Sequence, residues 1–322
     1  VVLTQFNPPM NPSRDTFVAL LKVCAQSQDI EMGYKLHEDM VKAMGNVHES
    51  DVFMGSALVG LYAKCGTLHK AQEVFDLLQV RNAVTWNALI TGYVECGDNE
   101  RVLSCFDQMQ LQGVFPDVVT FICTLKACGK VGFVAKGEEI HSQIVMKALE
   151  ILPLVGNSLI DMYIKLGLLP TAKHVFDALP LRTLVSWTMI ISGYTEGGQG
   201  NESLHLFEQM ERSGLVPDVA MYICTLRACR NIKSIGKGQK VHLEMMKKGL
   251  LEKDSCDVVS TLVDMYVKCG FLIEAGKILD NLVMKDVVLW TILISGYVEQ
   301  GYGEKALDCF MKMQSEGDIL AD

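Results

Sequence analysis

The chain lacks several features that would assign it to a common class of protein. No apolar run approaches the roughly 20 residues that a bilayer-spanning helix needs, so we expect a soluble protein. No C-x-x-C pair occurs among the 11 cysteines, most of which lie within apolar helical segments. Reduced, buried thiols in a reducing compartment are therefore expected instead of disulfides. No alternating strand pattern of useful length occurs either, which argues against a sheet-based fold.

Basic residues are the scarcer of the two charged classes. The 29 Lys and Arg residues and 38 Asp and Glu residues give a net charge of −9. This total argues only weakly against a nucleic-acid partner, because the local distribution of charge decides binding. The chain begins Val1-Val2, without an initiator Met or an arginine-rich leader, so we expect a segment of a longer protein.

The sequence contains three phrases that each occur three times. One phrase reads VTWNALITGYVECG, VSWTMIISGYTEGG and VLWTILISGYVEQG, and its tryptophans, Trp86, Trp187 and Trp290, lie 101 and then 103 residues apart. The second reads LYAKCG, MYIKLG and MYVKCG, and the third reads LLKVC, TLKAC and TLRAC. Such regular self-similarity predicts an array of repeated supersecondary units with one core along its length.

Each phrase has the apolar period of an amphipathic helix. From Trp86 the stripe continues at Leu89, Ile90 and Tyr93, and a second stripe covers residues 102–109 beyond Gly97. A pair of such helices cannot bury its own apolar face, so neighbouring pairs must stack. The prediction is an all-α solenoid of helix pairs.

The phrases WNALITGYVECG, GSALVGLYAKCGTLHKAQEVFD and TFICTLKACGKVGFVAKGEEIH resemble the pentatricopeptide-repeat family, specifically its plant organellar subclass with alternating P-, L- and S-type repeats. The resemblance implies a right-handed superhelical solenoid of antiparallel helix pairs. Residues 1–13 would be an extension or the remnant of a preceding repeat, and 14–322 one array of about nine repeats. The units are L 14–51, S 52–82, P 83–117, L 118–152, S 153–183, P 184–218, L 219–255, S 256–286 and P 287–322.

Proteins of this class bind one base of single-stranded RNA per repeat through two or three side chains. The resemblance implies that the fifth and last residues of each P or S unit contact the Watson–Crick edge of a base. These pairs are Ser56 with Asn82, Asn87 with Asp117, Asn157 with Thr183, Thr188 with Asp218, Ser260 with Asp286, and Thr291 with Asp322. Short polar side chains can discriminate base edges, with each good contact worth about 1 to 3 kcal/mol. The alternative is that they are helix N-caps, which favour the same residue types.

The second residue of the P units is a valine, and the resemblance implies that it wedges between bases: Val84, Val185 and Val288. Ordinary core packing is the alternative. Phosphate contact is implied for a lysine at the thirteenth position of the S units: Lys64, Lys165 and Lys268. A solvated lysine is the usual fate of such a residue. The P units carry Glu95, Glu196 and Glu299 there, which argues against continuous contact with the RNA backbone.

The pairing preferences of the family, with the L units left open, imply the target 5′-N-A-U-N-C-G-N-G-G-3′. The last base depends on Asp322, because its unit is one residue longer than the first P unit and Ala321 would otherwise take the reading position. The L units carry Val18, Ile122 and Ile223 at position five, so weak selectivity is expected there.

Catalytic and metal-binding readings find little support. His242-Leu243-Glu244 has the H-x-E spacing of a zinc deaminase, but no P-C-x-x-C follows. His242 occupies the same repeat position as His37 and His141, so we expect these histidines to pack the two helices of each L unit together. We expect no catalytic residue, metal, cofactor, small-molecule substrate or membrane contact within this chain.

The predicted function is sequence-specific binding of single-stranded organellar RNA for C-to-U editing, in a mitochondrion or chloroplast. Editing accessory proteins are candidate partners, and any deaminase would lie beyond Asp322 or act in trans. One alternative is RNA processing or stabilisation without editing. Another is a protein-binding helical scaffold, which would have no reason to keep Ser, Thr, Asn and Asp at position five.

Overall fold

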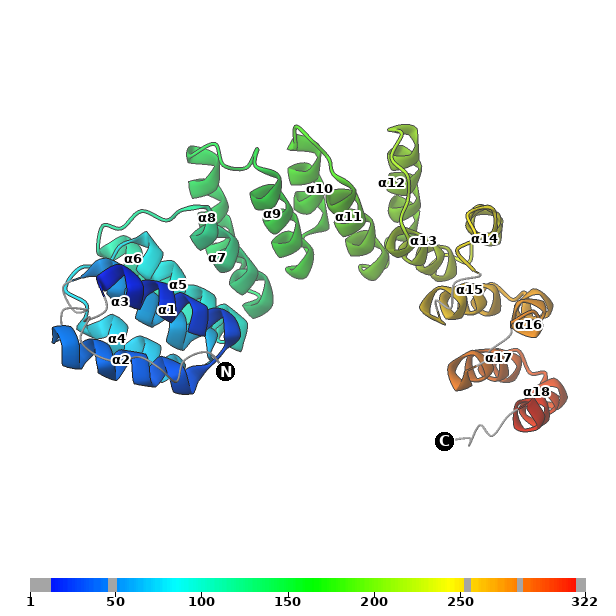
Figure 1. Ribbon diagram of the computed structural model, residues 1–322. Helices are drawn as coiled ribbons and strands as arrows, with labels where there is room; N and C mark the ends of the chain where they lie inside the picture. Colours follow the sequence, from blue (N-terminus) through cyan, green and yellow to red (C-terminus); the bar gives the residue numbers. More distant parts are fainter. Residues whose placement is uncertain (1–12, 46–50, 252–255, 283–285, 317–322) are drawn as a thin grey trace. The chain divides into compact units, whose positions relative to one another are not determined.

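The computed structural model describes residues 13–45, 51–251, 256–282 and 286–316, and throughout these ranges the regular structure is helical (Figure 1). The helices alternate between a first and a second member of a pair. The first helices are α1 Arg14–Ser27, α3 Val52–Lys64, α5 Ala83–Cys96, α7 Val118–Val131, α9 Pro153–Lys165, α11 Leu184–Glu196, α13 Val219–Asn231, α15 Cys256–Lys268 and α17 Val287–Glu299. The second helices are α2 Ile30–Met44, α4 Leu68–Leu77, α6 Asn99–Leu111, α8 Val134–Met146, α10 Leu169–Ala178, α12 Gly200–Arg212, α14 Ile235–Lys247, α16 Leu272–Asp280 and α18 Gly303–Glu316. The all-α fold class is confirmed.

The first helices begin at residues 14, 52, 83, 118, 153, 184, 219, 256 and 287, each at the predicted first residue of a repeat unit. Each start has a local cause. In most units the preceding residue is Asp, Asn, Thr or Ser, whose side chain accepts a hydrogen bond from a backbone N–H of the first turn. Several ends also have a local cause: Gly97 and Gly132 take the left-handed conformation that stops α5 and α7.

The chain divides into two compact units, Val1–Leu166 and Gly167–Asp322. In the first unit, α1, α3, α5, α7 and α9 contact one another in sequence, and the second helices α2, α4, α6 and α8 each pack on the first helix of their own pair. The second unit repeats this arrangement, with α11, α13, α15 and α17 in sequence and α12, α14, α16 and α18 beside them. Each unit is therefore a stack of helix pairs with a layer of first helices and a layer of second helices.

The tryptophan of the triple phrase locks one repeat onto the previous one. Trp86 is fully buried, and its ring meets the ring of Phe75 edge-on at 4.5 Å between centroids. Arg81 contacts the same phenylalanine: its guanidinium lies 4.8 Å from the centre of the Phe75 ring, and its Nε donates to the Phe75 carbonyl at 3.0 Å. The same three contacts recur in the second unit, where Trp187, Phe176 and Arg182 make them.

The glycine of the phrase permits close approach of neighbouring first helices. A Cβ placed on Gly92 in α5 would lie 2.7 Å from the Cβ of Ala63 in α3 and 2.9 Å from a methyl carbon of Leu68. Gly296 in α17 faces Val267 in α15 in the same way. Glycine at this position therefore sets the spacing of the layer that carries the candidate reading residues. None of the described helices is long and apolar enough to cross a membrane.

Candidate nucleic-acid interface

The last residue of each described P or S unit is the N-cap of the following helix. The caps are Asn82, whose Oδ1 accepts from the Thr85 N–H at 3.0 Å, Asp117 (Thr120 N–H, 3.0 Å), Thr183 (Ser186 N–H, 3.3 Å), Asp218 (Met221 N–H, 2.8 Å) and Asp286 (Leu289 N–H, 2.8 Å). The capping alternative is therefore correct for these residues. It does not exclude base contact, because an amide or carboxylate retains further hydrogen-bonding capacity. Asp322 and Ala321 lie outside the described residues.

The position-five residues lie one turn inside the first helices, where they cannot be caps. The hydroxyls of Ser56, Thr188 and Thr291 each donate to the carbonyl four residues earlier, at 2.6 to 2.8 Å. Ser260 donates to the Asp257 carbonyl at 3.2 Å. These bonds use the hydrogen of each hydroxyl and leave its oxygen able to accept a hydrogen bond from a ligand.

One predicted pair is in direct contact. Asn87 Nδ2 lies 2.9 Å from each carboxylate oxygen of Asp117, although the residues are 30 positions apart. Thr120 lies between them, with its hydroxyl 2.6 Å from Asn87 Oδ1 and 3.0 Å from Asp117 Oδ1. Burial raises the pKa of Asp117, but hydrogen bonds from the Thr120 N–H, Asn87 and the Thr120 hydroxyl outweigh it and bring the pKa below its ordinary value. The carboxylate is therefore a charged acceptor near neutral pH.

A second pair is joined through one intermediate hydroxyl. Thr85 Oγ1 lies 2.7 Å from Ser56 Oγ and 3.0 Å from Asn82 Oδ1. Thr85 and Thr120 are both fully buried and are both the third residue of the next repeat. In two consecutive repeats, position five and the last position are thus connected by the third residue of the repeat that follows.

The remaining pairs do not share this connection. The third residue of the repeat that follows the Thr188 unit is Met221, and that of the repeat that follows the Ser260 unit is Leu289. Their apolar side chains cannot bridge polar groups. Asn157 belongs to the first compact unit and Thr183 to the second, so each is described by itself. The Asn157 Oδ1 is buried and has no hydrogen-bond partner among the residues that the structure describes.

The three wedge valines are exposed. Val84, Val185 and Val288 have relative exposures of 63%, 59% and 56%, so core packing is the wrong interpretation of these residues. The sequence reasoning missed Phe53, which occupies the same second position in the first S unit and is 68% exposed. The repeat register alone would have found it.

A groove in the first unit brings the predicted groups together. Its volume is about 430 Å³, and its lining includes the predicted reading pair Ser56 and Asn82 and the predicted wedge Val84. Phe53 and Lys64 also line it, as does Lys22, which was not among the lysines predicted to contact phosphate. Polar, apolar and cationic groups thus line the same groove.

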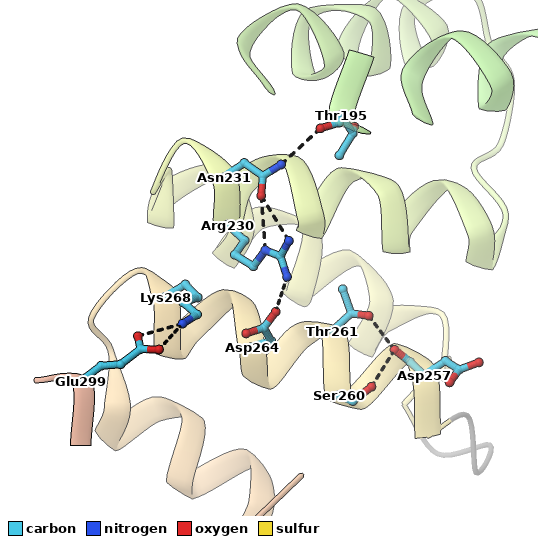
Figure 2. A network of polar contacts seen from close by, with 9 residues as sticks. All are labelled: Thr195, Arg230, Asn231, Asp257, Ser260, Thr261, Asp264, Lys268 and Glu299. Atoms are coloured by element: carbon cyan, nitrogen blue, oxygen red, sulfur yellow. Dashed lines mark hydrogen bonds and ion pairs between the residues drawn. The ribbon is translucent and has the colours of Figure 1, made fainter. Parts of the chain in front are cut away.

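The lysines at position thirteen differ in their partners. Lys165 pairs with Asp161 in its own helix at 2.5 Å. Lys268 lies 2.6 Å from Glu299, the acidic counterpart in the next P unit (Figure 2). Lys64 is exposed and has no ion pair with any described residue. Phosphate contact at this position is therefore unopposed only at Lys64, because the other two cations are already neutralised.

Figure 2 shows how polar contacts tie the first helices of the second unit together. Arg230 at the end of α13 binds Asp264 in α15 at 2.6 Å, and Asn231 donates to the Thr195 carbonyl at 3.2 Å. These bonds run from α11 through α13 to α15, and the Lys268–Glu299 pair extends them to α17. They cross-link the layer on which the candidate reading residues lie.

The histidine of the H-x-E triplet has a structural partner. His242 Nδ1 lies 2.9 Å from the Tyr266 hydroxyl, and His37 and His141 make the same contact with Tyr62 and Tyr163. These bonds join each L unit to the following S unit, whereas the sequence suggested packing within the L unit. Within the described ranges, no cluster of three His, Cys, Asp or Glu side chains could hold a metal ion.

The ten cysteines whose side chains the structure describes are free thiols. Burial raises the pKa of Cys105 and Cys229 to about 12 and that of Cys128 to about 11. Thiols with such pKa values are un-ionised at neutral pH, so they pack as small apolar groups.

Comparison with known families matches most of these repeats. A model of the PPR repeat family covers residues 81–130 and 182–231, and a model of the PPR repeat covers 15–43, 56–82, 157–181, 257–287 and 288–318. The chain belongs to the pentatricopeptide-repeat family. Its pentatricopeptide-repeat relatives include two proteins of Arabidopsis thaliana, the chloroplastic At4g18520 and the putative mitochondrial At3g25060. They are 34% and 30% identical to it, each over 97% of the chain, which covers 50% and 51% of them.

The chain spans about half the length of the curated relatives it matches. The organelles in their names are those expected for this protein, the mitochondrion and the chloroplast. The fold is that of the pentatricopeptide repeat protein PPR10, solved in complex with an 18-nt psaJ RNA element. The TM-score is 0.76 at 20% identity, over 96% of this chain and 46% of that one. PPR10 from maize also matches with a TM-score of 0.76 at 20% identity, over 95% of this chain and 44% of that one.

Proposed function

We propose that this pentatricopeptide-repeat array binds single-stranded RNA sequence-specifically, with one base for each P or S repeat. The observation that carries the proposal is the groove in which Ser56, Asn82 and Val84 meet Phe53 and Lys64. A base has a polar edge, two apolar faces and a neighbouring phosphate, and this groove offers a complement to each. The fold shared with PPR10, which has been solved with RNA, supports the same reading.

The Asn87–Asp117 pair illustrates how one base would be chosen. A carboxylate can only accept hydrogen bonds, so it favours the imino N–H of U over the unprotonated N3 of C. The hydrogen bond between the two side chains holds the acceptor in place before RNA arrives. Preorganisation of this kind lowers the entropy cost of recognition.

The same proposal assigns the repeats to the P-L-S subclass and their purpose to recognition of sites for C-to-U editing in organelles. A deaminase elsewhere in the full protein, or one supplied in trans, would perform the chemistry. The array itself would place the target cytidine, and editing accessory proteins would join it.

Binding to 5′-NAUNCGNGG-3′ and to a scrambled RNA of equal composition tests the proposal directly. We expect tighter binding to the former, and equal affinities would refute the assigned register. In the sharper version, Asn87→Thr should move the preference at the third base from U toward G. The wrong third base should weaken binding by about 5- to 150-fold, equivalent to about 1 to 3 kcal/mol. Val84→Ile, which keeps the apolar wedge, is the control and should leave the base preference unchanged.

A further inference from the structure

The L repeats carry a cation at one recurring position of their first helices. The ninth residue is Lys22 in α1, Lys126 in α7 and Arg227 in α13, and all three are exposed. No ion pair joins any of them to another residue within the described ranges. The P and S repeats have no cation at this position, where they carry Thr91, Ser192, Ser295, Gly60, Asp161 and Asp264.

The ninth residue lies on the same face of its helix as the fifth, because residues four apart are neighbours on a helix surface. In the first L repeat the two are Val18 and Lys22, and both line the groove that contains Ser56 and Asn82. The cation therefore lies beside the place where the next repeat would read its base. Val18, Ile122 and Ile223 cannot hydrogen-bond a base edge, so these repeats lack a reading group at position five.

We infer that Lys22, Lys126 and Arg227 bind phosphodiester groups of the RNA, so that each L repeat attaches the strand without regard to sequence. The inference rests on the proposed function and gives the L repeats a distinct task within it. An unpaired, exposed cation attracts a phosphate, whereas Lys165 and Lys268 already face Asp161 and Glu299. Contacts to phosphate position a strand and contacts to base edges specify it. Each attachment repeat would then be followed by two reading repeats.

The test compares two triple variants of the chain by measuring the dissociation constant against salt concentration. One is Lys22→Gln, Lys126→Gln and Arg227→Gln. The control removes three exposed lysines from second helices: Lys35→Gln, Lys277→Gln and Lys312→Gln. Each lost phosphate contact reduces the slope of log K against log salt by about 0.7, so the first triple should reduce it by about 2. The control should reduce it far less, and the preference for matched over scrambled RNA should persist in both.

Equal slopes for the two triples would overturn the inference, because a general loss of charge would then explain the change. Loss of the preference for matched RNA in the first triple would also overturn it, because the cations would then take part in reading. If the wild-type chain binds matched and scrambled RNA equally, the proposed reading fails, while a reduced slope confined to the first triple would still support phosphate binding. Circular dichroism spectra of both triples should match that of the wild type.

Discussion

The hydroxyl of Thr120 should matter more to the stability of the first unit than that of its neighbour Thr124. Both threonines are fully buried in α7. The Thr120 hydroxyl donates a hydrogen bond to Asn87 Oδ1 at 2.6 Å and accepts one from the Asp117 N–H at 3.2 Å. Thr120→Val leaves both groups without this partner, and an unsatisfied buried group costs about 1 to 3 kcal/mol. Asp117 still caps the helix through the Thr120 N–H, so we expect the free energy of unfolding to fall by about 1 to 3 kcal/mol in total.

Thr124→Val is the matched control. The Thr124 hydroxyl donates only to the carbonyls of Thr120 and Phe121 in its own helix, which also lie within reach of helical N–H donors. Its replacement strands no partner, so the cost should stay within about 0.5 kcal/mol. Urea unfolding followed by circular dichroism measures both, with the midpoints compared at unchanged slope. Equal losses for the two variants would show that the bridge between Asn87 and Asp117 adds nothing to stability.

Two further substitutions test the packing between repeats. Gly92→Ala should destabilise by about 1 to 3 kcal/mol, because the new methyl group meets α3, whereas Gly276→Ala in α16 meets nothing within 4 Å and should stabilise by about 0.5 to 1 kcal/mol; chemical unfolding gives both values, and a neutral Gly92→Ala would contradict the close approach. Burial lowers the pKa of His242 beneath its ordinary value near 6.5, so the neutral form is favoured in the folded state. Its contribution is complete above that value and declines as pH falls below it. We therefore expect the free energy of unfolding to fall less between pH 7.5 and pH 5.5 in His242→Asn than in the wild type. In the control His205→Asn, which replaces an exposed histidine, it should fall as much as in the wild type. Identical falls in all three proteins would refute this reasoning.

The starts of the first helices could be predicted from the sequence because the features that define them are local. Trp86 and Gly92 recur with their phrase, and the cap residues directly precede the helices that they start. The exposure of Val84 also follows from its place in the first turn of α5, opposite the buried Trp86 face. Periodicity therefore predicted the helix pairs, and the repeat register assigned the candidate reading residues.

Contacts between repeats were not predictable in the same way. The Asn87–Asp117 and Lys268–Glu299 contacts join residues 30 and 31 positions apart, and their formation depends on how adjacent first helices are rotated about their axes. Lys165 is different, because its partner Asp161 is four residues away on one helix and the pair could have been expected. The ion pair with Glu299 engages Lys268, one of the three lysines expected to contact phosphate, and only the packing of the helices reveals this.

The last residue of each described P or S unit starts the next helix, and this limits how such a protein can diversify. A helix start tolerates Asp, Asn, Ser and Thr with small differences in stability, while most other residues cost about 1 kcal/mol. The four side chains that folding accepts at this position also differ in charge and in donors and acceptors. Exchanges among them could therefore redirect an array to a new ligand one position at a time, with every intermediate still folded.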